Sequence, residues 1–139
     1  MGLIEGKMVP KDWGYEWWIV NNDLYCGKIL CIKKGSCCSL HYHKIKDEVL
    51  YVQDGKMVMI TTALDGGDKK VYTMMPGNAW RMLPNTPHQM YAVETTYIIE
   101  FSTHHEDSDS YRLSRELQIT EEELCETLRS KTSGSEGIG

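Results

Sequence analysis

Two histidines separated by a single residue, His41 and His43, are the first feature of the sequence that could do chemistry. Residues two apart in a β-strand point to the same face, so a strand here would present both imidazoles side by side. Glu48 follows after a short turn, and His88 lies on a later predicted strand. Neutral imidazoles with one carboxylate suit Zn, Fe(II), Mn or Ni better than Mg or Ca. His41 and His43 therefore make half of a site for one divalent transition metal, and Glu48 and His88 are the candidates for its other ligands.

These residues belong to a longer pattern of fixed spacing. A lone histidine on a strand is more often a core or surface residue than a ligand, but the joint spacing favours the ligand interpretation. The pattern Gly35-(five residues)-His41-Tyr42-His43-(four residues)-Glu48-(six residues)-Gly55 resembles the first motif of the cupin superfamily at every fixed position. The resemblance implies a small antiparallel jelly-roll barrel, or double-stranded β-helix, in which three histidines and one glutamate hold a metal.

A second, less regular pattern surrounds His88. Residues 77–88 resemble the second cupin motif, with the ligand His88 in place. The motif's first proline is Leu83 here, its following glycine is Asn85, and its final asparagine is Ala92. Asparagine is the non-glycine residue that best tolerates left-handed backbone, so Asn85 should preserve the turn.

Within the cupins, two segments are similar to the C-terminal domain of type II mannose-6-phosphate isomerases. Residues 11–16 are similar to an Arg-Pro-Trp-Gly segment of those enzymes, and residues 39–48 to their Ser-Leu-Gln-x-His-His-His-Arg-x-Glu segment. His41 stands in place of the glutamine, and Lys46 in place of the arginine. This narrower resemblance implies a sugar or sugar-phosphate substrate.

The elements that must position these residues are short strands. β-Branched and aromatic runs alternate with turn residues at intervals of 8 to 12 positions, which is typical of an all-β protein. We predict strands at residues 15–20, 24–33, 37–43, 48–53, 56–63, 70–75, 79–83, 88–93 and 95–101. Asp54-Gly55 is the strongest hairpin signal, because both residues accept the positive φ of a tight turn.

The 139-residue chain is the size of a single domain. We expect one cupin β-barrel over residues 1–113, with the N-terminal strands included. A C-terminal helical segment should follow at residues 114–131, because residues 120–123 form a Thr-Glu-Glu-Glu capping box. The Gly- and Ser-rich residues 132–139 should form a flexible tail.

Composition excludes several classes of protein. The net charge of -5 gives no support to nucleic-acid binding, and no apolar run approaches the roughly 20 residues that a membrane span needs. The first residues lack a secretory signal pattern, so we expect a cytoplasmic protein. Five cysteines without a Cys-x-x-Cys pair are expected to be reduced thiols.

The predicted site favours proton transfer between adjacent carbons of a sugar or carboxylate substrate, as in an isomerase or epimerase. Such a reaction needs a Lewis acid on the substrate oxygens and a base close to the carbon acid. Glu48 is the predicted base, with Lys46 or a tyrosine as the fallback, and Lys46, Arg81 or Arg112 could bind a phosphate or enediolate. Two alternatives stay open: a non-haem iron dioxygenase, and a non-enzymatic cupin that binds small molecules or carbohydrates.

Strand parity predicts a homodimer. If His41 and His43 face the interior, then Cys37 also faces inward, and Cys38 and Leu40 face outward. The outer face would then be apolar and would need cover. A second copy is the predicted cover; the alternative is the N-terminal segment of the same chain, with Trp13, Trp17 and Trp18.

Overall fold

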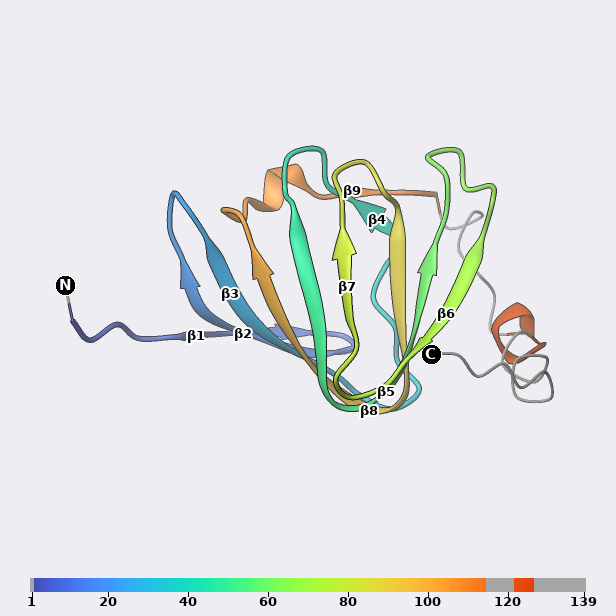
Figure 1. Ribbon diagram of the computed structural model, residues 1–139, viewed down its shortest axis with the longest axis horizontal. Coiled ribbons are helices and arrows are strands. Elements are labelled where there is room, and N and C mark those ends of the chain that lie inside the picture. Colours follow the sequence, from blue (N-terminus) through green and yellow to red (C-terminus); the bar gives the residue numbers. More distant parts are fainter. Residues whose placement is uncertain (1, 115–121, 127–139) are drawn as a thin grey trace.

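The computed structural model describes residues 2–114 and 122–126, and their architecture confirms the all-β prediction. The strands curve around a common interior, and the short helix at residues 122–126 lies outside it (Figure 1). Nine strands and one 3-10 helix lie within residues 2–114: β1 Lys7–Lys11, β2 Gly14–Asn21, β3 Cys26–Ile32, β4 His41–Tyr42, β5 Glu48–Thr61, β6 Lys70–Met74, β7 Ala79–Met82, β8 His88–Ser102, η1 Asp107–Asp109 and β9 Tyr111–Arg112.

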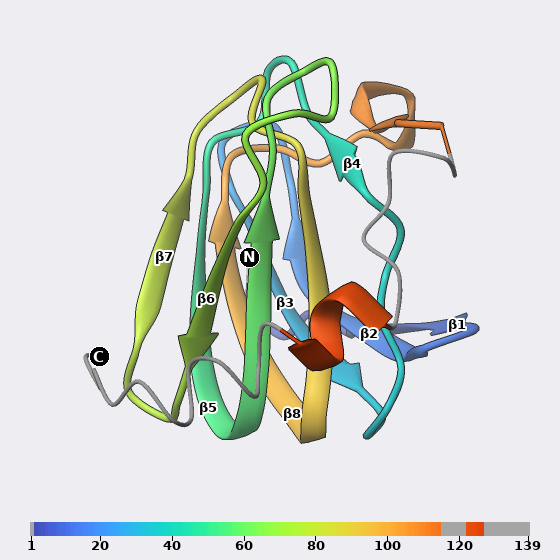
Figure 2. The same ribbon diagram turned by 90° about the vertical axis from the view of Figure 1, so that its right-hand side faces the viewer.

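Antiparallel pairing arranges these strands in two layers that share β5 and β8. The second half of β8 pairs with β3 on one side and with the first half of β5 on the other, and β1, β2 and β7 extend this first layer. The second half of β5 pairs with β6 and with the first half of β8, which also pairs with β4. Both long strands bend between the layers at one end of the molecule (Figure 2).

The hairpin prediction at Asp54-Gly55 is wrong. The predicted strands on either side of it are one continuous strand, β5, with register shifts against β8 between Val52 and Met57. Gly55 has a φ of 97°, and a Cβ at this position would lie 2.3 Å from the carbonyl oxygen of Thr95. A bulged corner, like a tight turn, needs a residue that accepts a positive φ. The sequence therefore marked Gly55 correctly as an irregular backbone position, but a hairpin was the wrong interpretation of it.

The parity prediction for residues 37–40 is also wrong. The predicted strand at 37–43 shortens to His41–Tyr42, preceded by an isolated bridge between Cys37 and Tyr91. Cys37 is exposed, whereas Cys38 and Leu40 are buried. Strict alternation holds only in a continuous strand, and the three residues between Cys37 and His41 are not in one.

Methionines and branched aliphatic side chains fill the space between the layers. The described core holds Leu30, Ile32, Cys38, Leu50, Val52, Met57, Met59, Met74, Met82, Met90, Ala92 and Ile98. A second cluster lies on the outer face of the β5–β6–β8 layer, where Leu124 of the helix at 122–126 packs against Val58 and Ile60 (Figure 2). The first two residues of the predicted capping box and the tail at 132–139 lie outside the described residues.

Candidate metal centre

Strand pairing brings together histidines that are far apart in sequence. His41 of β4 lies directly opposite His88 of β8, and His43 follows at the end of β4. The imidazole centroids are 4.5 Å apart for His41 and His88 and 5.1 Å apart for His41 and His43. Potential ligand atoms of all three residues lie within 4.8 Å of one another, which is the geometry that one metal ion requires.

Each of the three rings is oriented by a backbone carbonyl. The Nδ1 atoms of His41, His43 and His88 lie 2.8, 2.9 and 2.9 Å from the carbonyl oxygens of Ser39, Asp109 and Thr86. A carbonyl can only accept, so each Nδ1 carries the proton and each Nε2 keeps its lone pair for a metal.

The loop before His88 is tied to the strand that carries His43. Asn85 has a φ of 64°, which confirms that this residue replaces the motif's glycine in a left-handed turn. Its backbone N–H donates to the carbonyl of His43 over 2.6 Å. The departure from the family motif therefore leaves the position of His88 intact.

Burial keeps the three imidazoles neutral. It is the largest cause of the lowered pKa at each ring, and it brings the pKa of His41 to about 3 and those of His43 and His88 to about 4. The positive charge of Lys46 lowers all three further. The rings are therefore ready to bind a metal at neutral pH without first losing a proton.

Glu48 lies beside the histidines at the start of β5. Its side chain is 3% exposed, and Oε2 lies 3.8 Å from Nε2 of His43 and 3.6 Å from Nε2 of His88. The compact group of mutually close ligand atoms contains the three histidines and not Glu48. Burial, followed by repulsion from Glu100, raises the pKa of Glu48 to about 8.

Lys46 is buried in an ion pair with a carboxylate that spacing did not single out as a site residue. Its Nζ lies 2.7 Å from Oε2 of Glu100 and 3.8 Å from Oε1 of Glu48. The same Nζ donates to Nδ1 of His105 over 2.9 Å. Burial opposes the charge of Lys46, but Glu100 and Glu48 outweigh it and raise the pKa of the ammonium. Lys46 is thus placed to stabilise negative charge rather than to accept a proton.

Asp109 of η1 holds the loop between β4 and β5 in place. Its carboxylate accepts backbone N–H groups from Lys44 at 2.9 Å, Ile45 at 3.2 Å and Lys46 at 3.0 Å. Its own carbonyl accepts from His43. Sequence reasoning missed this residue, because nothing in its local pattern indicates a contact with residues more than sixty positions earlier.

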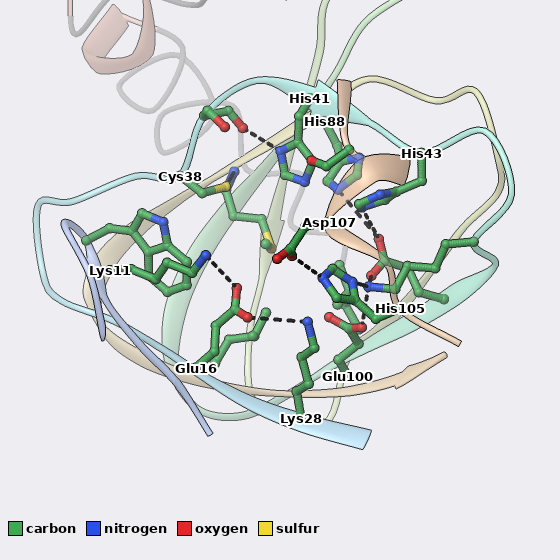
Figure 3. Close-up of a pocket in the computed structure, with 18 of the residues that line it drawn as sticks. Lys11, Glu16, Lys28, Cys38, His41, His43, His88, Glu100, His105 and Asp107 are labelled. Carbon is green, nitrogen blue, oxygen red and sulfur yellow. Dashed lines mark hydrogen bonds and ion pairs between the residues drawn. The ribbon is translucent and has the colours of Figure 1, made fainter. Parts of the chain in front are cut away.

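The three histidines form one wall of a polar cavity of about 140 Å³. Figure 3 shows the opposite wall, where Lys11, Glu16 and Lys28 project from the first layer. Glu16 pairs with both lysines, at 3.9 Å from Lys11 and 3.3 Å from Lys28. Sequence reasoning noted residues 11–16 for their resemblance but assigned neither Lys11 nor Glu16 to the site, and it missed Lys28.

The two arginines named as anion-binding candidates have different positions. Arg112 lines the cavity, lies opposite His41 across the β4–β9 pair, and has no ion-pair partner among the described residues. Arg81 does not line the cavity: it is exposed and pairs with Asp47 at 2.8 Å. The prediction for Arg81 is therefore wrong, because its strand directs it away from the interior. No tyrosine is among the described residues that line the cavity, so the fallback base of that type has no support.

The curved antiparallel sheet with histidines gathered inside it defines the class of protein. Residues 27–125 match the sequence profile of the family described as Cupin, and the chain therefore belongs to the cupin family. The search of curated proteins found no significant match. The described residues contain no helix that is long and apolar enough to cross a membrane.

Solved structures with low sequence identity share this fold. CapF, a capsular polysaccharide assembling protein from Staphylococcus aureus, superposes with a TM-score of 0.70 at 18% identity, over 79% of this chain and 34% of CapF. A variant of Bacillus subtilis oxalate decarboxylase superposes with a TM-score of 0.69 at 18% identity, over 97% of this chain and 38% of that enzyme. KdgF from Halomonas sp. superposes with a TM-score of 0.63 at 16% identity, over 76% of this chain and 92% of KdgF. The chain thus spans about a third of CapF, and these likenesses concern the fold alone.

The pKa values of the site predict a stability maximum near pH 6.5 for chelator-treated protein. Between about pH 4 and 6.5 the unfolded chain binds more protons at the three histidines than the folded chain does, so stability rises with pH. Between about pH 4.5 and 8 the folded chain binds an extra proton at Glu48, so that contribution falls with pH. Three histidines outweigh one carboxylate up to slightly above pH 6.5, and beyond that point Glu48 makes the larger contribution. Melting temperatures measured from pH 5 to 8.5 should pass through this maximum; a steady rise up to pH 8 would contradict the raised pKa of Glu48.

Proposed function

We propose that this cupin binds one divalent transition metal through His41, His43 and His88, and that it catalyses proton transfer in a small substrate, as an isomerase or epimerase does. Glu48, predicted from the sequence both as a fourth ligand and as the base, is proposed here as the base. The observation that carries the proposal is the position of Glu48. Its carboxylate is buried, and Oε2 lies 3.8 Å from Nε2 of His43 and 3.6 Å from Nε2 of His88. A base in that position can reach a carbon next to a metal-bound oxygen.

The roles divide between the metal and the protein side chains. When bound, a divalent metal would polarise the carbonyl or hydroxyl oxygens of the substrate. Glu48 accepts the proton from the neighbouring carbon at a carboxylate oxygen and returns it to the other carbon. Burial raises the pKa of Glu48, which makes its carboxylate a stronger base than an exposed one. Lys46 stays protonated and stabilises the charge that develops beside Glu48.

The charges of the cavity favour a sugar or a carboxylate as the substrate. Lys46 pairs with Glu100, whereas Lys11 and Lys28 share the single carboxylate of Glu16, so these pairs leave one positive charge unbalanced. Arg112 is the cavity cation without an ion-pair partner among the described residues, and it lies beside His41. One guanidinium next to a divalent metal suits a hydroxy-carbonyl compound with a single carboxylate or phosphate.

The state of the cysteines supports a cytoplasmic location. All five are free thiols, and three of them, Cys26, Cys31 and Cys38, are buried and therefore protected from solvent. Structural disulfides are common in oxidising compartments and rare in the cytosol. We therefore keep the cytoplasm as the proposed compartment.

Exchange of a substrate's carbon-bound hydrogen for deuterium tests the proposed reaction. Metal-loaded protein, incubated in D₂O with aldoses, ketoses, sugar acids and sugar phosphates, should incorporate deuterium beside the carbonyl of at least one compound. The same protein treated with chelator should not. Metal-dependent O₂ uptake without exchange would instead assign the iron dioxygenase. Tight ligand binding with neither activity would assign the non-enzymatic binding protein.

A further inference from the structure

The wall of the cavity opposite the histidines contains two lysines and one glutamate (Figure 3). Lys28 of β3 has 1% of its side chain exposed, and its Nζ donates to Oε1 of Glu16 over 3.3 Å. The indole N–H of Trp18 donates to the same carboxylate oxygen over 2.8 Å, and the Lys28 ammonium lies 4.3 Å from the centroid of that ring. Glu16 is therefore the counter-charge of Lys28, because a buried ammonium needs a partner.

Lys11 of β1 is the cation that this pair leaves without a full counter-charge. Its Nζ lies 3.9 Å from Oε2 of Glu16, which is too far for a hydrogen bond. Its side chain is 37% exposed, lines the cavity and forms no other ion pair among the described residues. One carboxylate cannot neutralise two ammonium groups, so this wall offers one positive charge at Lys11.

Asp107 is the acidic side chain at the cavity margin that would compete for this charge. Its carboxylate accepts the Nε2–H of His105 over 2.9 Å, and 88% of its side chain is exposed to screening by water. The hydrogen bond from His105 is the main cause of the lowered pKa of Asp107, and the charges of Lys11 and Lys28 contribute less. Asp107 therefore lies near Lys11 without forming an ion pair with it.

The cavity thus has a cation on each of two opposite walls. Arg112 lies beside His41 on the histidine wall, and Lys11 stands on the other wall. A molecule that fills the cavity would displace the water around Lys11. If the molecule had no negative group there, it would leave the ammonium without hydrogen-bond acceptors, which costs binding free energy. A site of this kind rejects a ligand that lacks the matching polar group.

We propose that Lys11 binds an anionic oxygen group of the substrate, a carboxylate or a phosphate, at the end of the molecule away from the histidines. That the ligand is a substrate rests on the proposed function; that this wall binds an anion does not. Lys11 is then a specificity-determining residue, and Lys28 is a positioning residue that keeps Glu16 beyond hydrogen-bond distance of Lys11. The substrate class narrows from sugars in general to sugar acids and sugar phosphates.

An NMR titration of isotope-labelled, chelator-treated protein tests the anion site without any metal or reaction. Acetate and inorganic phosphate are the probes, each added at constant ionic strength. Binding should shift the backbone amide signals of Lys11 and Trp13, which line the cavity together, and the shifts give the dissociation constant. Tighter binding of phosphate would assign a phosphate as the end group of the substrate, and tighter binding of acetate would assign a carboxylate.

Two variants should change the dissociation constant in opposite directions. Lys11→Met should weaken anion binding at least about ten-fold, because a charge-assisted hydrogen bond is lost. Glu16→Gln should tighten it about ten-fold, because the negative charge beside Lys11 is removed and Lys28 becomes available as well. A wall that served only the stability of the fold would not bind anions more tightly after losing its carboxylate.

The matched control is Lys7→Met, which removes the same charge from the same strand. Lys7 lies 5.5 Å from the centroid of the Trp18 ring but does not line the cavity. Anion affinity in this variant should stay within about two-fold of the wild-type value, which is less than one hydrogen bond contributes. Circular dichroism of all three variants shows whether the fold is retained.

Two results would overturn the proposal. One is unchanged anion affinity in Lys11→Met, with signal shifts confined to the surroundings of Arg112. The other is weaker anion binding in folded Glu16→Gln. If instead anion binding follows the expected pattern and no compound shows deuterium incorporation, the proposed reaction fails and the anion site stands. Where both hold, Lys11→Met should raise KM for the anionic substrate at least about ten-fold, with kcat and metal content nearly unchanged.

Discussion

Protein purified without chelator from a His41→Ala/His43→Ala variant should contain less than about one tenth of the metal that the wild-type chain holds. The change removes two of the three imidazoles whose ligand atoms lie within 4.8 Å of one another, and one histidine with one carboxylate cannot hold a divalent ion tightly. The strands should persist, because most of the core lies between the layers and does not depend on these rings. Elemental analysis and circular dichroism measure the two effects.

A histidine outside the site provides the control. His104 is bonded through Nδ1 to the carbonyl of Asn22 and does not line the cavity. His104→Ala should therefore keep the full complement of metal. Full occupancy in the double variant would remove the metal assignment altogether, whereas loss in both variants would show that the substitutions act through stability.

The histidine cluster could be predicted because its two parts carry strong local signals. His41 and His43 share a short segment with Glu48, and His88 follows a turn that Asn85 can form. The register that places His41 opposite His88 joins strands 47 positions apart in sequence, and only the family resemblance implied it. Physical reasoning from spacing alone would have stopped at two ligands.

The rest of the site depends on contacts that leave no local signal. Asp109 anchors the loop before Glu48 through three backbone N–H groups, and Lys28 reaches Glu16 across a strand pair. Each is a single polar residue whose partner is set by tertiary pairing, so neither periodicity nor spacing marks it. Buried charges of this kind are tolerated only when paired, and the pairs become visible only in the folded chain.

Two of the errors in the fold share one physical origin. Others do not: the predicted strands at 88–93 and 95–101 are one continuous strand, β8, and β1 was not predicted. Gly55 and the segment after Cys37 were interpreted by rules for regular strands and tight turns. In the structure each is an irregularity, a bulged corner in β5 and an extended stretch with one bridge before β4. Such irregularities let a sheet curve around a cavity, so local rules fail where the barrel bends around its site.

Glu48→Gln should reduce deuterium incorporation by about 10²- to 10⁴-fold, the range expected when a general base is removed. Glutamine keeps the size and hydrogen-bonding shape of the side chain but cannot accept the substrate's proton near neutral pH. The three imidazoles remain, so the variant should still bind one metal per chain. Elemental analysis and mass spectrometry of the recovered sugar, made on the same preparation, separate these two roles of Glu48.

Asp107→Asn is the control, because Asp107 is also a carboxylate of the cavity but is mostly exposed at its margin. It should keep exchange within a few-fold of the wild-type rate. Loss of metal in Glu48→Gln would show that Glu48 acts as the fourth ligand, so that the base must be sought elsewhere. Undiminished exchange with metal retained would exclude Glu48 as the base. The exchange rate and the metal content together therefore decide which function the buried carboxylate serves. Loss of a metal ligand would lower the metal content, whereas loss of a base would lower only the exchange rate.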